Sequence, residues 1–339
     1  MMVFNPSDNF IRMLVEKLFR RCLGLFGAVF NDIFRPGRKR QDETAFNDQQ
    51  TGLSEDMVVV CLGSYQEYLK LLEAENELIQ KIAEKEFALT QFTEQTGIRG
   101  FCIICGHTVD FQVDFQYSFF DKKIRIPNWR ERMICPDCGM NGRTRAIYHF
   151  LLAKVKPPRN SLIYITEQVT PLFNRLRKYY PKLTGSEFLD GTAPSPGNRR
   201  TKIRNEDLTK LTFRDESFHY ILSFDCLEHI PDYRKAIREI FRCLKENGIF
   251  YFCVPFYPYQ QFNTTRAYIN DDQQIVHLEP PEYHGNPLSE NGSLCYNNFS
   301  FQLLDEIRET GFRDVEVVLY WSEKYGYLGG FRALFVATK

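Results

Sequence analysis

The sequence predicts an α/β fold, and three observations along the chain support this class. Residues 207–255 read as a buried strand, an amphipathic helix and a second buried strand. Residues 161–187 repeat the alternation of strand and helix. Two Cys-x-x-Cys pairs within residues 99–150 predict a small metal-bound module in front of these elements. Strands that alternate with helices build a mostly parallel sheet, so we expect a main α/β domain preceded by a smaller unit.

The bulk composition narrows the classes of protein that fit. A chain of 339 residues is long enough for about two domains that each bury a core. Its 43 basic and 43 acidic residues give no overall attraction to nucleic acid or to an acidic membrane, so any polyanion site has to be local. Four of the ten cysteines form the two pairs and six are scattered, which favours a reducing cytoplasm over a secreted disulfide framework. The sequence has no apolar run of the length that spans a membrane, so we expect a soluble or peripheral protein.

Three segments precede the cysteine pairs. Residues 1–40 predict a basic amphipathic helix, because apolar side chains recur at helical spacing with arginine and lysine between them. This helix either packs on the protein or a partner, or makes a peripheral membrane contact. Residues 41–63 are polar and turn-rich and predict a linker. Residues 64–98 predict a long surface helix or a helical hairpin.

The two cysteine pairs, Cys102 with Cys105 and Cys135 with Cys138, define what we call the cysteine module, residues 99–150. A glycine follows the second cysteine of each pair, which lets backbone amides approach the sulfurs. Four thiolates suit tetrahedral zinc, and a site closed by four cysteines leaves no position for water, so we expect a structural zinc in a ribbon-like module. A redox pair or unliganded thiols are the alternatives.

Basic and aromatic side chains are interleaved around these cysteines. Such a surface could bind a phosphate-bearing or sugar substrate, or RNA bases. It could equally be a solvated face beside a hydrophobic base. The side chains concerned are Lys122, Lys123, Arg125, Arg130, Arg132, Arg143, Arg145, Tyr117, Phe119, Phe120 and Trp129.

Residues 151–339 carry the alternating elements of the main domain. A first buried strand at 161–166 leads to a helix that ends at Tyr180, with Thr170 as its N-cap and Pro171 in its first turn. The later elements follow in order: a second strand at 182–187, a third just before Asp207 and a fourth at 218–224, a helix from about 232 to 245, a fifth strand from 248 to 254, a helix at 299–310, and strands at 314–321 and 331–338.

The motifs DLTKLTFRDESFHYILS and LEHIPD, in this order from residue 207, resemble the middle of class I S-adenosylmethionine-dependent methyltransferases, of the group called methyltransferase type 11. The resemblance covers about residues 161–339. It implies a Rossmann-like domain with a seven-stranded sheet that an antiparallel hairpin closes. The paired cysteines and the segment WRERMICPDCGMNGRTRAIYHFL in front of it are similar to a bacterial group that bears a zinc ribbon.

The resemblance implies a set of residues that bind S-adenosylmethionine. Glu187 ends the second strand, where nucleotide-binding folds place a carboxylate against ribose hydroxyls. Asp207, with Leu208 beside it, corresponds to the acid that contacts adenine. Ser223 and Phe224 end the fourth strand at the carboxyl edge, where open α/β sheets bind ligands. The first turn, residues 166–170, lacks the glycines that the family carries there, and Glu167 is the residue that would hold the cofactor's ammonium group.

Residues 257–298, which we call the acceptor insertion, follow the fifth strand, and inserts at this place in the family cover the acceptor. His284 and Tyr283 in the insertion, and His229 in LEHIPD, are the candidates for orienting or deprotonating a nucleophile. Each has a structural alternative: the insertion residues could satisfy loop backbone groups, and His229 could cap or pack its helix.

The sequence as a whole predicts methyl transfer from S-adenosylmethionine to a small-molecule or glycan-like acceptor, with zinc in a structural role. Two alternatives remain at this stage. The first is a zinc-finger-bearing RNA methyltransferase, although the balanced charge does not favour nucleic acid. The second is a noncatalytic scaffold with a degenerate cofactor site, which the glycine-free first turn suggests.

Overall fold

The computed structural model describes residues 56–121, 124–189 and 203–339. The amphipathic helix predicted for residues 1–40 lies outside the described residues, as do most of the predicted linker and the side chains of Lys122 and Lys123. Among the described residues, no helix has the length and apolar character needed to cross a membrane.

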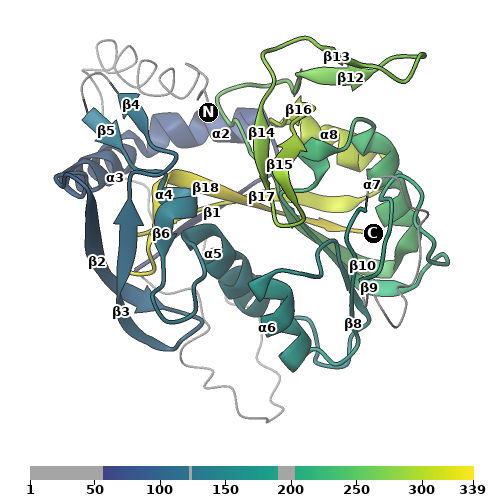
Figure 1. The fold of residues 1–339 in the computed structure, drawn as a ribbon, viewed down its shortest axis with the longest axis horizontal. Helices are drawn as coiled ribbons and strands as arrows, with labels where there is room; N and C mark the ends of the chain where they lie inside the picture. The colour runs from purple at the N-terminus through teal and green to yellow at the C-terminus, as the bar shows by residue number, and fades with distance from the viewer. Residues whose placement is uncertain (1–55, 122–123, 190–202) are drawn as a thin grey trace.

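One seven-stranded sheet organises the described chain (Figure 1). Its strands, in spatial order, are β1 Val58–Leu62, β17 Arg313–Ser322, β18 Tyr327–Thr338, β10 Leu244–Cys253, β9 Phe218–Phe224, β7 Ile163–Ile165 and β8 Leu183–Gly185. The pairs formed among β10, β9, β7 and β8 are parallel, whereas β18, β17 and β1 pair antiparallel. The predicted α/β class and the closing antiparallel hairpin are therefore confirmed.

The seventh strand comes from an unexpected segment. β1, with the sequence VVVCL, lies at the end of the stretch that the sequence analysis placed in the linker at 41–63, and that boundary is corrected. A short apolar, β-branched run is typical of a strand, but the polar residues before it hid the signal. On the opposite side of the sheet, the strand expected to precede Asp207 appears in the described residues as an isolated parallel bridge between Glu187 and Asn205.

Helices cover both faces of the sheet, and successive side chains along a strand point to opposite faces. In β10, Tyr251 and Cys253 point to one hydrophobic core, while Phe250 and Phe252 point to the other. The first core also contains α5 Gly142–Phe150 and α6 Pro171–Tyr179, and the second contains α2 Tyr65–Ala74, α7 Tyr233–Cys243 and α8 Gln302–Glu309. A sheet buried on both faces explains why its central strands are nearly continuous apolar runs.

The segment predicted as a surface helix or hairpin forms two consecutive helices, α2 and α3 Asn76–Ala88, separated at Glu75. A carboxylate near the end of α3 fastens it to the sheet. Glu86 Oε1 accepts hydrogen bonds from the indole of Trp321 at 2.7 Å and from the backbone N–H of Gly329 at 2.7 Å. The predicted helical segment ends before residue 98, because β2 begins at Gln95.

The cysteine module consists of short strands around two turns. Its elements are β2 Gln95–Cys102, β3 His107–Asp114, β4 Phe119–Asp121, β5 Ile124–Ile126, α4 Trp129–Arg132, β6 Met133–Ile134 and then α5, which a π-helical turn Leu151–Val155 continues. Phe111 and Met133 of the module share one hydrophobic core with Leu222 and Val318 of the sheet. The module therefore packs as part of the main body.

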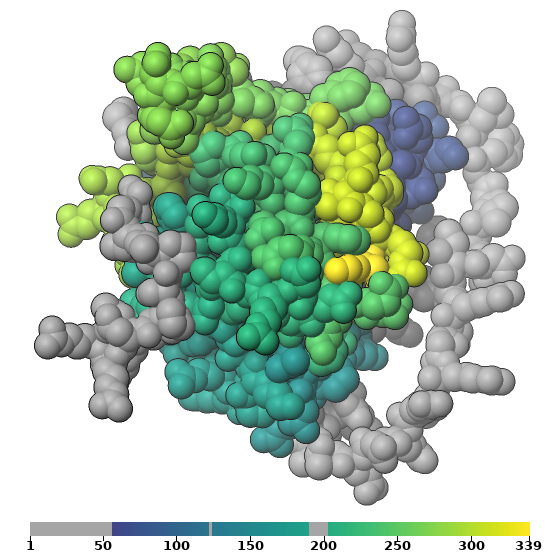
Figure 2. Space-filling model, turned by 90° about the vertical axis from the view of Figure 1, so that its right-hand side faces the viewer, coloured from purple at the N-terminus to yellow at the C-terminus, as the bar shows by residue number. Residues whose placement is uncertain are grey.

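The acceptor insertion forms short strand pairs above the carboxyl edge of the sheet. These are β11 Thr264–Thr265 with β16 Asn297–Asn298, β12 Ala267–Ile269 with β13 Ile275–His277, and β14 Tyr283–Asn286 with β15 Ser289–Leu294. The β12–β13 hairpin, coloured light green, stands at the top of the molecule in the space-filling view (Figure 2). A 3-10 turn at Leu227–His229 joins β9 to α7 beneath β14 and β15.

Candidate functional site

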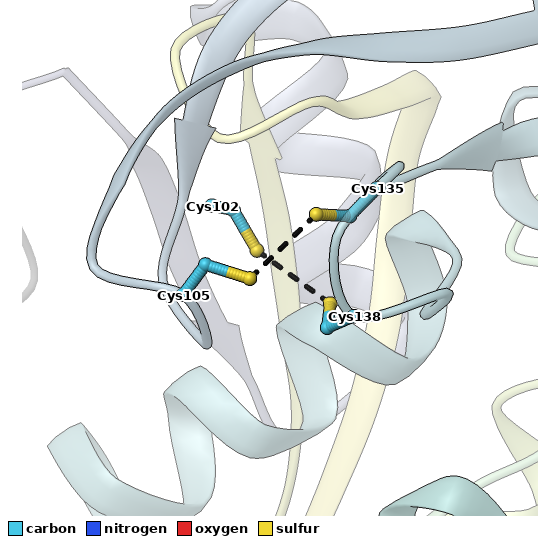
Figure 3. A group of neighbouring side chains, drawn as sticks. All are labelled: Cys102, Cys105, Cys135 and Cys138. Atoms are coloured by element: carbon cyan, nitrogen blue, oxygen red, sulfur yellow. Dashed lines mark hydrogen bonds between the residues drawn. The ribbon is translucent and has the colours of Figure 1, made fainter.

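The four cysteines of the module converge on one point (Figure 3). The Sγ atoms of Cys102 and Cys138 lie 3.8 Å apart, as do those of Cys105 and Cys135. A tetrahedral ion with zinc–sulfur bonds of about 2.3 Å separates its ligands by about 3.8 Å. The two cysteine turns therefore already have the spacing of a four-thiolate zinc site.

Backbone geometry explains how each turn presents its sulfurs. Gly106 and Gly139, the residues after each pair, have φ of 76° and 70°, a region that glycine adopts without strain. Their N–H groups donate to the carbonyls of Cys102 and Cys135 at 2.8 and 2.9 Å. A hydrogen bond from the Cys138 thiol, together with backbone amides, lowers the pKa of Cys102 to about 5. Burial and the neighbouring sulfurs raise the pKa values of Cys105 and Cys138, so without a metal ion the negative charge of the cluster is held mainly by Cys102.

Among the described basic side chains around the cysteines, Arg125 is exposed, whereas the other arginines are held within the protein. Arg145 is fully buried and donates to the carbonyls of Met133 at 2.7 Å and Met140 at 2.9 Å, with its guanidinium 3.8 Å from the centre of the Phe111 ring. Arg132 donates to Asp114 at 2.9 Å. These arginines connect the parts of the module to each other, so they do not form an open basic surface.

Arg130 and Arg143 connect the cysteine module to the end of β9. Arg130 donates to Asp225 Oδ2 at 2.7 Å, and Arg143 Nε lies 3.0 Å from the same oxygen. Glu131 accepts from Arg143 at 2.9 Å. We call these four residues the arginine network. Although burial raises the pKa of Asp225, the two guanidinium groups outweigh it and hold that pKa far below its usual range.

The predicted cofactor residues gather along the carboxyl edge of β7, β8 and β9. Glu187 follows β8, and its Oε1 accepts hydrogen bonds from the backbone N–H of Gln168 at 2.5 Å and of Val169 at 2.8 Å. Thr166, at the end of β7, donates to the hydroxyl of Ser223 in β9 at 3.1 Å. The glycine-free first turn is therefore shaped by a carboxylate from the neighbouring strand.

Glu167 has no hydrogen-bond partner for its buried Oε1. Burial raises the pKa of this carboxyl group to about 7. An orphaned carboxylate oxygen at the edge of a nucleotide-binding sheet fits a cationic ligand group, because a buried charge without a partner is costly. This observation matches the ammonium group that Glu167 is expected to hold.

Asp207 lies at the beginning of the segment that follows the isolated bridge at Asn205. Its Oδ1 accepts from the backbone N–H and the hydroxyl of Thr209, both at 2.8 Å, so the carboxylate also shapes its own turn. Leu208 and Phe224 are 7 % exposed and belong to the two cores. Sequence reasoning missed Glu206, which is buried and binds Arg204 and Thr212, because the neighbouring Asp207 carries the recognisable motif.

The structure brings His229 and His284 together, although they are far apart in sequence. Their rings are 4.9 Å apart, and both face the carboxylate of Glu228. Glu228 Oε1 lies 3.8 Å from His229 Nε2 and 3.7 Å from His284 Nδ1. We call Glu228, His229 and His284 the His–Glu cluster. Tyr283, the third predicted catalytic residue, is 48 % exposed on β14.

Other groups fix the orientation of both imidazoles. His229 Nδ1 lies 2.8 Å from the carbonyl of Leu294, and His284 Nε2 lies 3.2 Å from Glu282 Oε1. Glu282 in turn pairs with the buried Arg266 at 3.2 Å. Burial lowers the pKa of His284, but the Glu228 and Glu282 carboxylates raise it to about 9. No pattern in the sequence predicts that Glu228 is buried.

Comparisons with known proteins agree with the motifs quoted above. Residues 174–252 match a family described as "Methyltransferase domain". Phosphoethanolamine N-methyltransferase 2 of Caenorhabditis elegans is 41% identical over 49 residues, which cover 14% of this chain and 11% of that enzyme. The chain therefore spans about a tenth of the length of the curated relative that it matches.

Solved structures show a distant likeness. A S-adenosylmethionine-dependent methyltransferase from Mesorhizobium loti is 15% identical, with a TM-score of 0.37, and the match covers 60% of this chain and 100% of that one. The 1,6-didemethyltoxoflavin-N1-methyltransferase of Burkholderia thailandensis is 17% identical, with a TM-score of 0.35 over 58% of this chain and 77% of that one.

Proposed function

We propose that the protein, in which residues 174–252 match a methyltransferase domain, transfers a methyl group from S-adenosylmethionine to a small-molecule or glycan-like acceptor. The observation that carries the proposal is the buried, unpartnered Oε1 of Glu167, beside the edge at which Glu187 and Ser223 also lie. A site that leaves a carboxylate oxygen without a partner needs a cationic group to complete it.

The residues present fit the cofactor as follows. Glu187 would hold the ribose hydroxyls, Asp207 with Leu208 the adenine, and Glu167 the ammonium group, while Ser223 and Phe224 form the floor at the end of β9. S-adenosylmethionine supplies a sulfonium-activated methyl group. The chain's own contribution is to align the acceptor and exclude water, because transfer to a nucleophilic atom needs little acid–base help.

His229 and His284 would orient the acceptor from above this edge, and Tyr283 would contact it from β14. Asp225 is a poor candidate for a base, because Arg130 and Arg143 hold its pKa far below the usual range. We propose a structural role for zinc at Cys102, Cys105, Cys135 and Cys138, since the four sulfurs are closed around one point.

A small-molecule acceptor is favoured over RNA by two observations. Arg130, Arg132 and Arg143, which could have formed a basic surface, are paired with carboxylates inside the protein. The enzyme that shares 41% identity over 49 residues is named for phosphoethanolamine, a small molecule. The peripheral membrane contact proposed for residues 1–40 concerns a segment outside the described residues.

The test is a calorimetric titration of zinc-replete protein with S-adenosylmethionine and, separately, S-adenosylhomocysteine. We expect micromolar binding, and we expect Glu187→Gln to weaken it roughly 10- to 100-fold, because hydrogen bonds to a charged group contribute about 1.5–3 kcal/mol. Asp207→Asn should weaken it less. Glu309→Gln, an exposed carboxylate on α8, is the matched control and should bind as the wild type does.

Two results would contradict this function. If neither ligand binds to folded protein, the noncatalytic scaffold becomes the better reading. If both bind and Glu187→Gln and Asp207→Asn leave affinity unchanged, the cofactor lies elsewhere than at this edge.

A further inference from the structure

The His–Glu cluster has an unusual distribution of polar atoms. Glu228 is fully buried, and neither of its carboxylate oxygens has a hydrogen-bond partner. The nearest polar atoms are nitrogens of His229 and His284, at 3.8 and 3.7 Å. A buried carboxylate without hydrogen bonds is strongly unfavourable, so a positive charge has to compensate it, either a proton on His284, 3.7 Å away, or a bound cation.

In each imidazole, one nitrogen lies next to Glu228, and the partner of the other nitrogen fixes which nitrogen carries the proton. His229 Nδ1 lies 2.8 Å from the Leu294 carbonyl, which only a protonated nitrogen can satisfy. His284 Nε2 lies 3.2 Å from the Glu282 carboxylate, which likewise requires a proton on that nitrogen. In the neutral tautomers, His229 Nε2 and His284 Nδ1 therefore direct lone pairs at the same place as the Glu228 carboxylate.

From this arrangement we propose that Glu228, His229 and His284 bind a divalent transition-metal ion. The two distances from Glu228 Oε1 to the histidine nitrogens, 3.8 and 3.7 Å, exceed by only a few tenths of an ångström the separation of about 3.0–3.5 Å between neighbouring ligands of an ion held at about 2.1 Å. All three ligand atoms lie within 4.8 Å of one another, so the two imidazoles have to move toward each other to bind one ion. Two imidazoles and one carboxylate suit zinc, iron or cobalt rather than magnesium or calcium.

The surroundings have the features that such sites use. A carbonyl or carboxylate that accepts from the outer nitrogen of a ligand histidine fixes its tautomer and orientation. Leu294 and Glu282 occupy these positions, and Arg266 holds Glu282 at 3.2 Å. With both rings neutral, Glu228 and Glu282 carry two negative charges and Arg266 one positive charge. The net negative charge favours a divalent cation.

The proposed metal deepens the function proposed above, on which its role in transfer rests. Three protein ligands leave coordination positions open, in contrast to the closed four-cysteine cluster. An open position on a divalent ion takes an oxygen atom and lowers the pKa of a bound hydroxyl. The cluster lies next to the cofactor edge, because the turn that carries Glu228 and His229 directly follows the end of β9, where Ser223 and Phe224 lie. The acceptor class that fits is a hydroxyl-bearing small molecule.

The test uses full-length protein that retains one zinc in the cysteine cluster and is titrated with Co²⁺ alone. We expect one further equivalent to bind, with visible cobalt absorption but without the thiolate-to-cobalt charge-transfer band that a cysteine site would show. Glu228→Gln and His284→Asn should each lower the Co²⁺ affinity at least 10-fold. Glu282→Gln, which changes only the group behind His284, should lower it roughly 10-fold.

His277→Asn is the matched control, because His277 is an exposed histidine on β13 of the same insertion, and it should bind Co²⁺ as the wild type does. If no Co²⁺ binds beyond the zinc that the cysteines hold, the inference is wrong, because a proton on His284 would then supply the positive charge beside Glu228. Binding unchanged in both Glu228→Gln and His284→Asn would overturn it as well. Thermal melts and the zinc content show whether Glu228→Gln and His284→Asn are folded. If either is not folded, the Co²⁺ affinity of Glu282→Gln tests the site instead.

The two proposals fail separately. Protein that binds S-adenosylmethionine and no Co²⁺ contradicts only the metal site. Protein that binds Co²⁺ in the cluster and neither cofactor form contradicts only the methyl transfer.

Discussion

At the scale of single residues, Glu167 carries a carboxylate that the fold leaves only partly compensated. Its Oε1 is buried without a partner, and burial raises its pKa to about 7. A carboxyl group whose pKa is raised on folding stabilises the folded state below the unfolded value, near 4.5, and loses that contribution as the pH rises through the folded value. The ligand-free protein should therefore lose stability between about pH 4.5 and 7 because of this residue.

Replacing Glu167 with glutamine removes the ionisable group and keeps its shape. We expect Glu167→Gln to be more stable than the wild type at pH 8 by about 1–2 kcal/mol, a value discounted for the partial exposure of the side chain, and to differ little at pH 4.5. Urea unfolding of both proteins, without cofactor, at the two pH values measures the difference. A stability difference that is the same at both would show that Glu167 does not titrate in this range.

Single residues also show what sequence reasoning could not reach. His229 and His284 were selected from the sequence separately, as candidates for one role. Their convergence on Glu228 depends on the β14–β15 hairpin folding back over the turn after β9, which places the Leu294 carbonyl against His229. No local pattern encodes that contact, because the residues that make it are separated by most of α7, β10 and the acceptor insertion.

At the scale of elements, local patterns predicted the central unit well. The strand expected at 218–224 is β9, and the expected N-cap Thr170 accepts from the N–H of Phe173 at 3.1 Å at the start of α6. Apolar runs and helix caps depend on residues close together in the sequence, so they can be recognised without knowledge of the fold. β1 was missed because five residues pair with a strand near the other end of the chain, and only that pairing distinguishes them from a linker.

The proposed zinc makes the stability of the cysteine module depend on an ion. We expect Cys135→Ser to release one zinc per chain and to destabilise the protein by several kcal/mol, because the binding free energy of a structural zinc contributes to folding. The core that surrounds Cys135 continues into the sheet, so the loss should lower the unfolding temperature of the main transition. Metal analysis and calorimetric melting measure both effects.

Cys61→Ser is the control for this prediction, because Cys61 is an exposed thiol on β1 outside the cluster. It should retain the zinc and melt close to the wild type. A Cys135→Ser protein that kept its full zinc content would contradict the four-cysteine site, whatever its stability.

At the scale of the whole molecule, the arginine network joins the cysteine module to the end of the central strand. Asp225 has a φ of 47°, which aspartate and asparagine tolerate better than most residues, so Asp225→Asn removes the charge with little backbone cost. The variant leaves Glu131 as the carboxylate partner of Arg130 and Arg143, and we expect its free energy of unfolding to fall by about 3–5 kcal/mol. In a double-mutant cycle with Arg130→Met, the coupling should be about 2 kcal/mol or more.

The pair formed by Arg99 and Asp110 provides the comparison. It joins β2 and β3 of the same module at 3.7 Å, but its side chains are 76% and 63% exposed. Its coupling in the same type of cycle should stay below about 1 kcal/mol. Equal couplings for the two pairs would mean that the arginine network does not fasten the module to the sheet.

The place of β1 in the sheet has a consequence for how the protein is made. A ribosome releases β1 long before its pairing partner β17, because nearly all the other elements of the sheet lie between them in the sequence. Arg145 of the cysteine module likewise waits for the carbonyls of Tyr325 and Gly326 in the turn between β17 and β18. Chains usually fold from the N-terminus as they are synthesised. Here β1 and the buried guanidinium of Arg145 have to wait for their partners until β17 and the turn after it have been synthesised.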